Sequence, residues 1–163
     1  GAGNGEFADW LVAEGHKVVC VEPSKDGSQI IRERFPDIPL IIQDSYTPIP
    51  RTSSSHSFLS LEVIEHCFDP ILFLRSIHQS MQSGEILILS TPFHGYFKNL
   101  CISLINGWDR HFNVFWTCGH IKFFSRNSLE LMLTNSGFEI LDYSLYGRMP
   151  LLRSGMIYVV KKI

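Results

Sequence analysis

The chain has 163 residues, of which 45% are hydrophobic and 18% are charged. This composition excludes an intrinsically disordered chain, because enough apolar surface is available to form a core. The formal net charge of -2 excludes a general positive field of the kind that collects nucleic-acid phosphates, so no nucleic-acid partner is expected.

The cysteines and the lengths of the apolar runs indicate in which cellular compartment the protein is expected. Cys20, Cys67, Cys101 and Cys118 are too far apart to form a CxxC pair, which argues against a zinc ribbon or a thioredoxin-like redox site. Reduced thiols of this kind are typical of cytoplasmic proteins. No apolar run approaches the roughly 18 residues that a membrane-spanning helix needs. We therefore expect a cytoplasmic protein without a membrane span.

Helical and strand patterns alternate from the first residue onward. A glycine loop, residues 1–5, opens a helix over residues 6–14 that Gly15 ends. The β-branched run in residues 17–22 predicts a buried parallel strand. The next elements are a helix that Ser24 caps and Pro36 ends, a strand over residues 40–42 and a polar loop over residues 47–56.

The same alternation continues in the rest of the chain. The predicted elements are a strand over 58–61, a helix begun by Asp69-Pro70 with Leu72, Phe73, Ile77 and Met81 inward, a strand over 85–90, and a helix over 125–136 with Leu129, Met132 and Leu133 inward. Residues 138–146 and 156–162 predict two final strands. The connection between them is too short for a crossover helix, so this pair should be antiparallel.

Strands alternating with helices predict an α/β fold with a doubly wound, mostly parallel sheet and a terminal antiparallel hairpin. No internal repeat or low-complexity linker interrupts the chain, so residues 1–163 should form a single domain. Within it, residues 92–119, here called the aromatic segment, lack periodicity and are rich in Phe, Tyr and Trp. We interpret this segment as an insertion that covers a small-molecule pocket. The alternatives are a loop without a fixed place and a homodimer contact.

The strand ends of such a sheet are where a ligand is expected. The glycine loop allows close backbone approach at a helix N-terminus, and Glu22, just past a strand, can accept hydrogen bonds from both hydroxyls of a ribose. Asp44 ends the next strand at a place suited to an adenine amino group. Each also has a simpler interpretation: the glycines as turn formers, Glu22 as an exposed strand end and Asp44 as a turn residue. Their joint order along the chain nevertheless predicts a nucleoside site.

With these residues in place, the sequence resembles the class I S-adenosylmethionine-dependent methyltransferases. The resemblance rests on Gly1-Ala2-Gly3-Asn4-Gly5, Val21-Glu22-Pro23, Asp44-Ser45, the stretch from Leu61 to Pro70, Ser83-Gly84, Leu89-Ser90-Thr91-Pro92, His120 to Ser125, and Ser136-Gly137-Phe138. It implies a seven-stranded sheet with an antiparallel last strand and S-adenosylmethionine as the cofactor. The cofactor-binding residues that it implies are Gly1, Ala2, Gly3, Gly5, Glu22, Pro23, Asp44, Ser45, Leu61 and Glu62.

The first strand of that family, which carries an acidic residue two positions before the first glycine, has no counterpart here. It is the central strand of the sheet, and without it two edges would be unpaired. We therefore expect the chain to be incomplete at its N-terminus, with an apolar segment before Gly1.

The expected reaction is methyl transfer to a small apolar or aromatic acceptor, at oxygen. Transfer from a sulfonium needs positioning and removal of a proton from the acceptor, and His66 and His120 are the candidate general bases. Their alternative role is structural hydrogen bonding.

Glu62, Glu65 and His66 also match the Glu-x-x-Glu-His motif that binds a divalent metal in ubiquinone-pathway O-methyltransferases and in small-RNA 2′-O-methyltransferases, with His120 at the place of a further ligand. The same pattern occurs in family members without metal, where it ties down the loop, and this second interpretation is favoured.

Two other functions fit parts of the pattern. A nicotinamide-dependent oxidoreductase also uses a glycine loop and an acid on the ribose, but the spacing Gly1-x-Gly3-x-Gly5 differs from G-x-G-x-x-G. A non-catalytic binding subunit with the methyltransferase fold is the other alternative. Intact Gly1, Gly3, Gly5, Glu22 and Asp44 argue against such degeneration.

Overall fold

A computed structural model describes residues 1–51, 57–147 and 153–163. The chain divides into two compact units, Gly1–Ile49 and Pro50–Ile163, which are described one at a time. The part of the predicted polar loop at residues 52–56 lies outside the described residues. No helix in the described ranges has the length and apolar character needed to span a bilayer.

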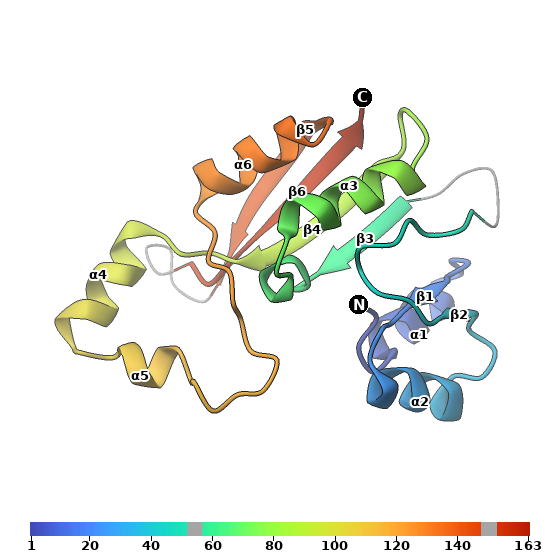
Figure 1. The fold of residues 1–163 in the computed structure, drawn as a ribbon, viewed down its shortest axis with the longest axis horizontal. Helices are drawn as coiled ribbons and strands as arrows, with labels where there is room; N and C mark the ends of the chain where they lie inside the picture. The colour runs from blue at the N-terminus through green and yellow to red at the C-terminus, as the bar shows by residue number, and fades with distance from the viewer. Residues whose placement is uncertain (52–56, 148–152) are drawn as a thin grey trace. The chain divides into compact units, whose positions relative to one another are not determined.

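The first unit is a short βαβ unit preceded by one helix (Figure 1). Its elements are α1 (Glu6–Ala13), β1 (Cys20–Val21), α2 (Lys25–Arg34) and β2 (Leu40–Ile41). The two strands are parallel, with Cys20 opposite Leu40. Ala8, Cys20, Ile31 and Ile38 form the core of this unit. The predicted strand over 17–22 is therefore shortened to two residues, while both predicted helices are confirmed.

The second unit contains the larger sheet. Its elements are β3 (Ser57–Leu61), the 3-10 helix η1 (Ile64–His66), α3 (Pro70–Ser80), β4 (Ile86–Pro92), α4 (Tyr96–Leu104), α5 (Trp108–His111), α6 (Arg126–Asn135), β5 (Phe138–Tyr146) and β6 (Gly155–Lys162). The strand order is β3-β4-β6-β5. β3 and β4 are parallel, and β6 is antiparallel to both of its neighbours, which confirms the expected antiparallel last strand.

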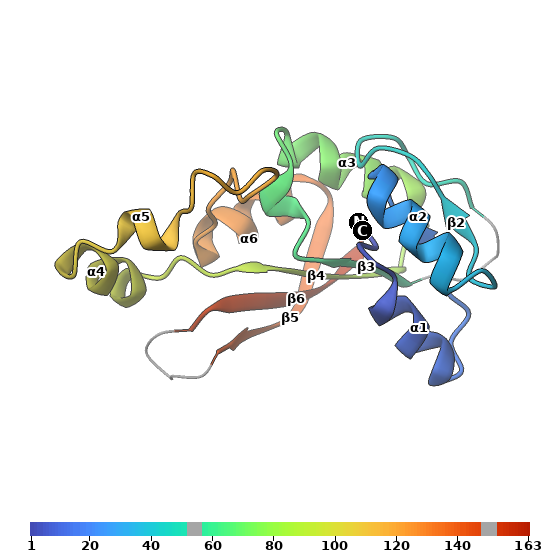
Figure 2. The same ribbon diagram turned by 90° about the horizontal axis from the view of Figure 1, so that it is seen from below.

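Both long helices of the second unit, α3 and α6, lie on one face of this sheet (Figures 1 and 2). Every second residue of β6 is fully buried, as Met156, Tyr158 and Val160 show. On the helices, Leu74 of α3 and Leu129 of α6 are fully buried as well. This layer fixes the strands, and so the loops that leave their carboxyl ends.

The strand count differs from the expectation. The described residues contain six strands in two separate sheets, so a single seven-stranded sheet is not confirmed. The expected first strand would precede Gly1, and the count of seven stays a prediction.

Two local predictions are wrong. The aromatic segment is not irregular throughout, because it contains α4 and α5. Only Ile102 of these two helices is buried, and α5, with four residues, is too short for a helical period to show in its sequence. In α3, Leu72 is 44% exposed and Leu74 takes the expected inward place, since the buried stripe follows Phe73, Leu74 and Ile77.

Candidate functional site

The glycine loop and Glu22 are joined by hydrogen bonds in the first unit. The backbone N–H of Gly3 donates to Oε2 of Glu22 at 2.8 Å, and the N–H of Ser24 donates to Oε1 at 2.9 Å. The N–H of Ala2 donates to the carbonyl of Val21, so the loop runs beside the end of β1. The carboxylate is 5% exposed, and each oxygen retains lone-pair capacity for a further donor.

Two glycines of the loop have backbone conformations that suit glycine. Gly3 and Gly5 have φ of 58° and 83°. A Cβ on Gly5 would lie 2.9 Å from Cγ1 of Ile31, whereas a Cβ on Gly3 would meet nothing within 4 Å. Gly5 therefore lets the loop pack on α2, while Gly3 borders open space that a ligand could enter.

Gly27 is a residue of this region that the sequence analysis missed. A Cβ there would lie 2.7 Å from the carbonyl oxygen of Gly3 and 3.0 Å from Cγ of Glu22. Its N–H also donates to Oγ of Ser24, the N-cap of α2. A glycine in the first turn of a helix, where it carries a propensity cost, was the signal available in the sequence.

Asp44 is turned toward its own loop. Its Oδ1 accepts from the N–H groups of Tyr46 and Thr47 at 2.7 and 2.8 Å, and the hydroxyl of Thr47 bonds both carboxylate oxygens. The hydrogen bond from Tyr46 is the main cause of a lowered pKa of Asp44. The side chain thus fits the simpler interpretation, a turn residue, although it is exposed and accessible. Pro23 is also exposed, and Gly1, Ala2 and Ser45 lie in the same first unit.

In the second unit, Glu62 follows β3 with a positive φ of 55°, which is unusual outside glycine. Its Oε1 accepts hydrogen bonds from Oγ of Ser90 at 2.7 Å and from the hydroxyl of Tyr146 at 2.8 Å. Leu61, the preceding residue, ends β3 beside Ser90 of β4. The sequence pattern gave no indication of Ser90 or Tyr146 as partners of this carboxylate.

Glu65, His66 and His120 form a cluster within the second unit. Glu65 is fully buried, and its Oε2 accepts from the hydroxyl of Thr91 at 3.0 Å. Its Oε1 has no hydrogen-bond partner and lies 3.9 Å from Nε2 of His66 and 3.9 Å from Nε2 of His120. Backbone bonds from Ile121 and Lys122 to the carbonyl of Glu65 hold the segment after His120 against η1.

Burial shifts the pKa values of two members of this cluster, Glu65 and His120. It raises the pKa of Glu65, an effect to which the nearby charge of Glu62 adds. It lowers the pKa of His120, and His66 lowers it further. Nδ1 of His66 lies 3.3 Å from the carbonyl oxygen of Gly119, a pairing that places the proton on Nδ1 and leaves the lone pair of Nε2 free. The lowered pKa leaves the His120 imidazole neutral at pH 7, and Nε2 of His66 is free to act as an acceptor.

Both imidazoles line a pocket of about 580 Å³. Its other walls come mainly from the aromatic segment and its flanks: Phe68, His111, Phe112, Asn113, Val114, Trp116, Cys118, Gly119 and Ile121. The edge of the Trp116 ring faces His66, with ring centroids 6.3 Å apart. The predicted bases therefore open onto a mostly apolar cavity of small-molecule size.

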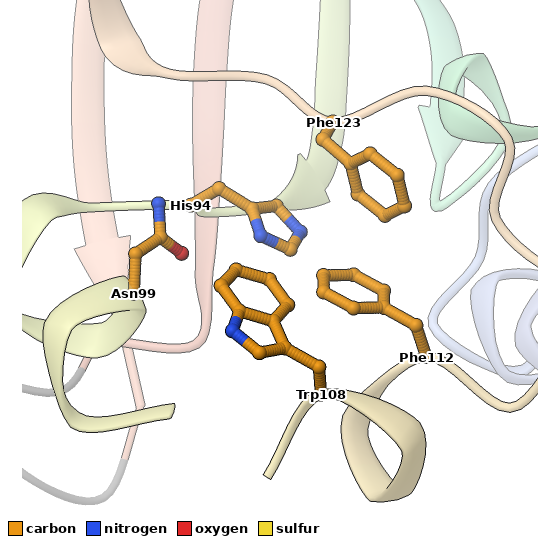
Figure 3. A pocket seen from close by; sticks show the side chains of 5 residues that line it. All are labelled: His94, Asn99, Trp108, Phe112 and Phe123. Carbon is orange, nitrogen blue, oxygen red and sulfur yellow. The ribbon is translucent and has the colours of Figure 1, made fainter. Parts of the chain in front are cut away.

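A second pocket, of about 330 Å³, shares Phe112 with the first (Figure 3). His94, Asn99, Trp108, Phe112 and Phe123 line it. Burial lowers the pKa of His94 to about 4, aided by Lys98 and His111, so this imidazole is neutral at pH 7. Its walls are therefore uncharged and largely aromatic.

Comparison with known proteins decides the family. Residues 1–143 match the family described as methyltransferase domain. The chain belongs to that family. This membership confirms the resemblance to S-adenosylmethionine-dependent methyltransferases.

The curated relatives are distant. Two proteins from two strains of Mycobacterium tuberculosis, each named a probable S-adenosylmethionine-dependent methyltransferase, are 24% identical over 139 residues, which is 85% of this chain and 46% of each relative. The chain thus spans about half the length of the curated relatives it matches.

The solved structures that resemble this chain share its fold. An S-adenosylmethionine-dependent methyltransferase from Methanosarcina mazei superposes with a TM-score of 0.77 at 14% identity, over 100% of this chain and 90% of that chain. The [4+2]-cyclase SpnF has a TM-score of 0.73 at 15% identity, over 99% of this chain and 72% of that one. Since a cyclase shares the fold, the fold alone does not specify the reaction.

Proposed function

We propose that this protein transfers the methyl group of S-adenosylmethionine to a hydroxyl oxygen of a small, apolar or aromatic acceptor. The observation that carries the proposal is the pair of imidazole Nε2 atoms beside Glu65, which line a cavity with apolar and aromatic walls. When bound, the cofactor supplies a methyl group on a positively charged sulfur, which is already a good leaving group.

The first unit has the features that a nucleoside needs. We assign the binding of the nucleoside end of the cofactor to Gly1, Ala2, Gly3 and Gly5 of the loop and to Glu22, with Pro23, Asp44 and Ser45 beside them. Open space at Gly3 and the spare lone pairs of Glu22 support this assignment. In the second unit we assign Leu61 and Glu62 to the same cofactor.

The imidazoles act on the acceptor in this proposal. His66 or His120 takes the proton of the acceptor hydroxyl at Nε2 as the oxygen forms its bond to the methyl carbon. The carboxyl group of Glu65, 3.9 Å from both Nε2 atoms, then stabilises the positive charge on the imidazole. The aromatic segment, residues 92–119, acts as a lid that excludes water from the pocket.

The wider assignments follow from the same features. We propose that the two units make up one methyltransferase domain and that the protein works in the cytoplasm, which its four free cysteines support. The acceptor is a small molecule, since the lining of the larger pocket includes no lysine or arginine to bind a polyanion. Exposed side chains such as Val114 and Phe115 are available for a homodimer contact.

Two measurements test this function. Calorimetry on the full-length protein should detect S-adenosylhomocysteine and not NAD, and the reverse result would favour an oxidoreductase. Incubation of phenols and aliphatic alcohols with methyl-labelled cofactor should give labelled ethers, and His66→Gln with His120→Gln should lower kcat by about 100-fold or more. His16→Gln, an exposed histidine of the first unit, is the matched control and should leave kcat unchanged.

A metal centre is a second candidate for the same cluster. One ligand atom from each of Glu65, His66 and His120 lies within 4.8 Å of the others, and the unpartnered Oε1 of Glu65 favours a cation there. Glu62, which the sequence motif includes, is instead bonded to Ser90 and Tyr146. Two imidazoles and one carboxylate suit manganese, iron or zinc better than magnesium. Loss of activity in chelator, restored by one of these ions, would select this candidate, while full turnover in chelator would exclude it.

A further inference from the structure

Tyr146 is far from Glu62 in the sequence but reaches it across the sheet. The strand order is β3-β4-β6-β5, so a side chain at the end of β5 must pass over β6 and β4 to reach the residue that follows β3. The hydroxyl of Tyr146 does so and donates to Oε1 of Glu62 at 2.8 Å. Ser90 of β4 donates to the same oxygen at 2.7 Å.

Gly155 makes this crossing possible. It lies opposite Tyr146 in the β5–β6 pair, and a Cβ on it would lie 2.1 Å from Cζ and 2.3 Å from the hydroxyl oxygen of Tyr146. Gly155 does not have a positive φ, so the backbone itself would accept alanine. The room that glycine leaves is therefore used by the Tyr146 ring.

The two hydroxyls act on one carboxylate oxygen only. Within the described residues, Oε2 of Glu62 receives no hydrogen bond, and the side chain is exposed. Without its two donors, an exposed glutamate would sample several rotamers, at a cost in entropy when a ligand fixes it. Burial and the bond to Glu62 raise the pKa of Tyr146 to about 12, so the phenol keeps its proton at neutral pH.

We propose that Tyr146 is a positioning residue of the cofactor site, which holds the Glu62 carboxylate so that Oε2 faces the ligand. Glu62 has a positive φ, and in this backbone conformation its side chain bonds Ser90 of β4 and Tyr146 of β5. This inference rests on the proposed role of Glu62 in binding S-adenosylmethionine, and it adds a residue from the C-terminal hairpin to that role.

Calorimetry of S-adenosylhomocysteine binding to the full-length protein tests the proposal. Tyr146→Phe keeps the ring and removes the hydroxyl, and should weaken binding by about three- to tenfold, the range expected for one hydrogen bond. Gly155→Ala keeps both hydroxyls and displaces the ring, and should weaken binding by a similar factor. Tyr143→Phe, on the same strand but bonded to Arg126, is the matched control and should bind within twofold of the parent.

The double variant separates positioning from general damage. If Gly155 acts only through the Tyr146 hydroxyl, Gly155→Ala should weaken binding no further once Tyr146→Phe is present. Unchanged binding by Tyr146→Phe, or two losses that multiply, would overturn the proposal. If the parent protein bound no S-adenosylhomocysteine, the proposed function and this role would both fail. Coupling between Tyr146→Phe and Glu62→Gln in urea unfolding would then show the hydrogen bond without the role.

Discussion

Glu22 is the residue whose replacement tests the first unit most directly. Its carboxylate accepts charge-assisted hydrogen bonds from two backbone N–H groups, those of Gly3 and Ser24. Both donors belong to segments that Glu22 holds together, the glycine loop and the N-terminus of α2. Glu22→Ala therefore removes a side chain that links them through both carboxylate oxygens.

The size of the effect follows from these two bonds. A hydrogen bond to a charged group contributes about 1.5–3 kcal/mol, and water can replace part of it because Gly3 and Ser24 are exposed. We expect Glu22→Ala to lower the free energy of unfolding by about 2–4 kcal/mol. Glu22→Gln keeps one acceptor but turns an NH₂ group toward the other donor, so its loss should be about 1–2 kcal/mol.

Urea unfolding followed by circular dichroism measures the loss, and amide hydrogen exchange locates it. The amides of Gly3 and Ser24 should exchange faster in both variants. Glu33→Ala is the control, because Glu33 is an exposed glutamate on α2 that accepts a hydrogen bond from the side chain of Gln29 on the same helix. The reasoning is refuted if Glu22→Ala unfolds within about 0.5 kcal/mol of the parent, the usual range for a surface substitution.

Three further predictions concern other parts of the site. Gly5→Ala should destabilise the first unit by about 1–3 kcal/mol, because backbone strain at φ 83° adds to a 2.9 Å contact between the new Cβ and Ile31. Gly3→Ala should cost about 1 kcal/mol, because its new Cβ would meet no other atom within 4 Å and only the backbone strain remains. Urea unfolding of the two variants compares these costs. Asp44→Ala should weaken S-adenosylhomocysteine binding less than Glu22→Ala does, since its carboxylate is engaged in its own turn, and equal losses in calorimetry would contradict this. The raised pKa of Glu65 means that ionisation of this carboxyl group opposes folding. The stability that the group contributes is present below its ordinary pKa of 4.5 and is lost as pH rises through the higher pKa of the folded state. Glu65→Gln should remove this loss of stability, as measured by urea unfolding at several pH values with chelator present.

The elements that short-range chemistry specifies could be predicted from the sequence. Ser24 caps α2 through the N–H of Gly27, Asp69 caps α3 through the N–H of Leu72, and Ser125 forms a capping box with Ser128. Each of these interactions joins residues three positions apart, so the sequence alone displays both partners. The antiparallel final pair follows as simply, from a connection too short for a helix.

The partners of the site residues could not be predicted in this way. Thr91 bonds Glu65 across 26 positions, and Tyr146 bonds Glu62 across 84. Such pairs depend on strand order and register, which place β4 beside β3 and bring the side chain at the end of β5 within reach of it only after the sheet has formed. The direction of the Asp44 carboxylate was missed for a different reason. An aspartate two and three positions before backbone N–H groups of a turn can accept from them or bind a ligand, and the sequence pattern is the same for both.

Two residues that depart from ordinary structural preferences lie three positions apart, after β3. Glu62 has a left-handed backbone conformation without being glycine, and Glu65 is fully buried with one carboxylate oxygen unpartnered. Each feature costs about 1–3 kcal/mol, which is a large part of the stability of a small domain. Asparagine or glycine at 62 and a glutamine at 65 would relieve much of this cost without changing the fold. The proposed function gives this cost a reason, because it needs two carboxyl groups after β3: Glu62 for the cofactor and Glu65 beside two imidazoles.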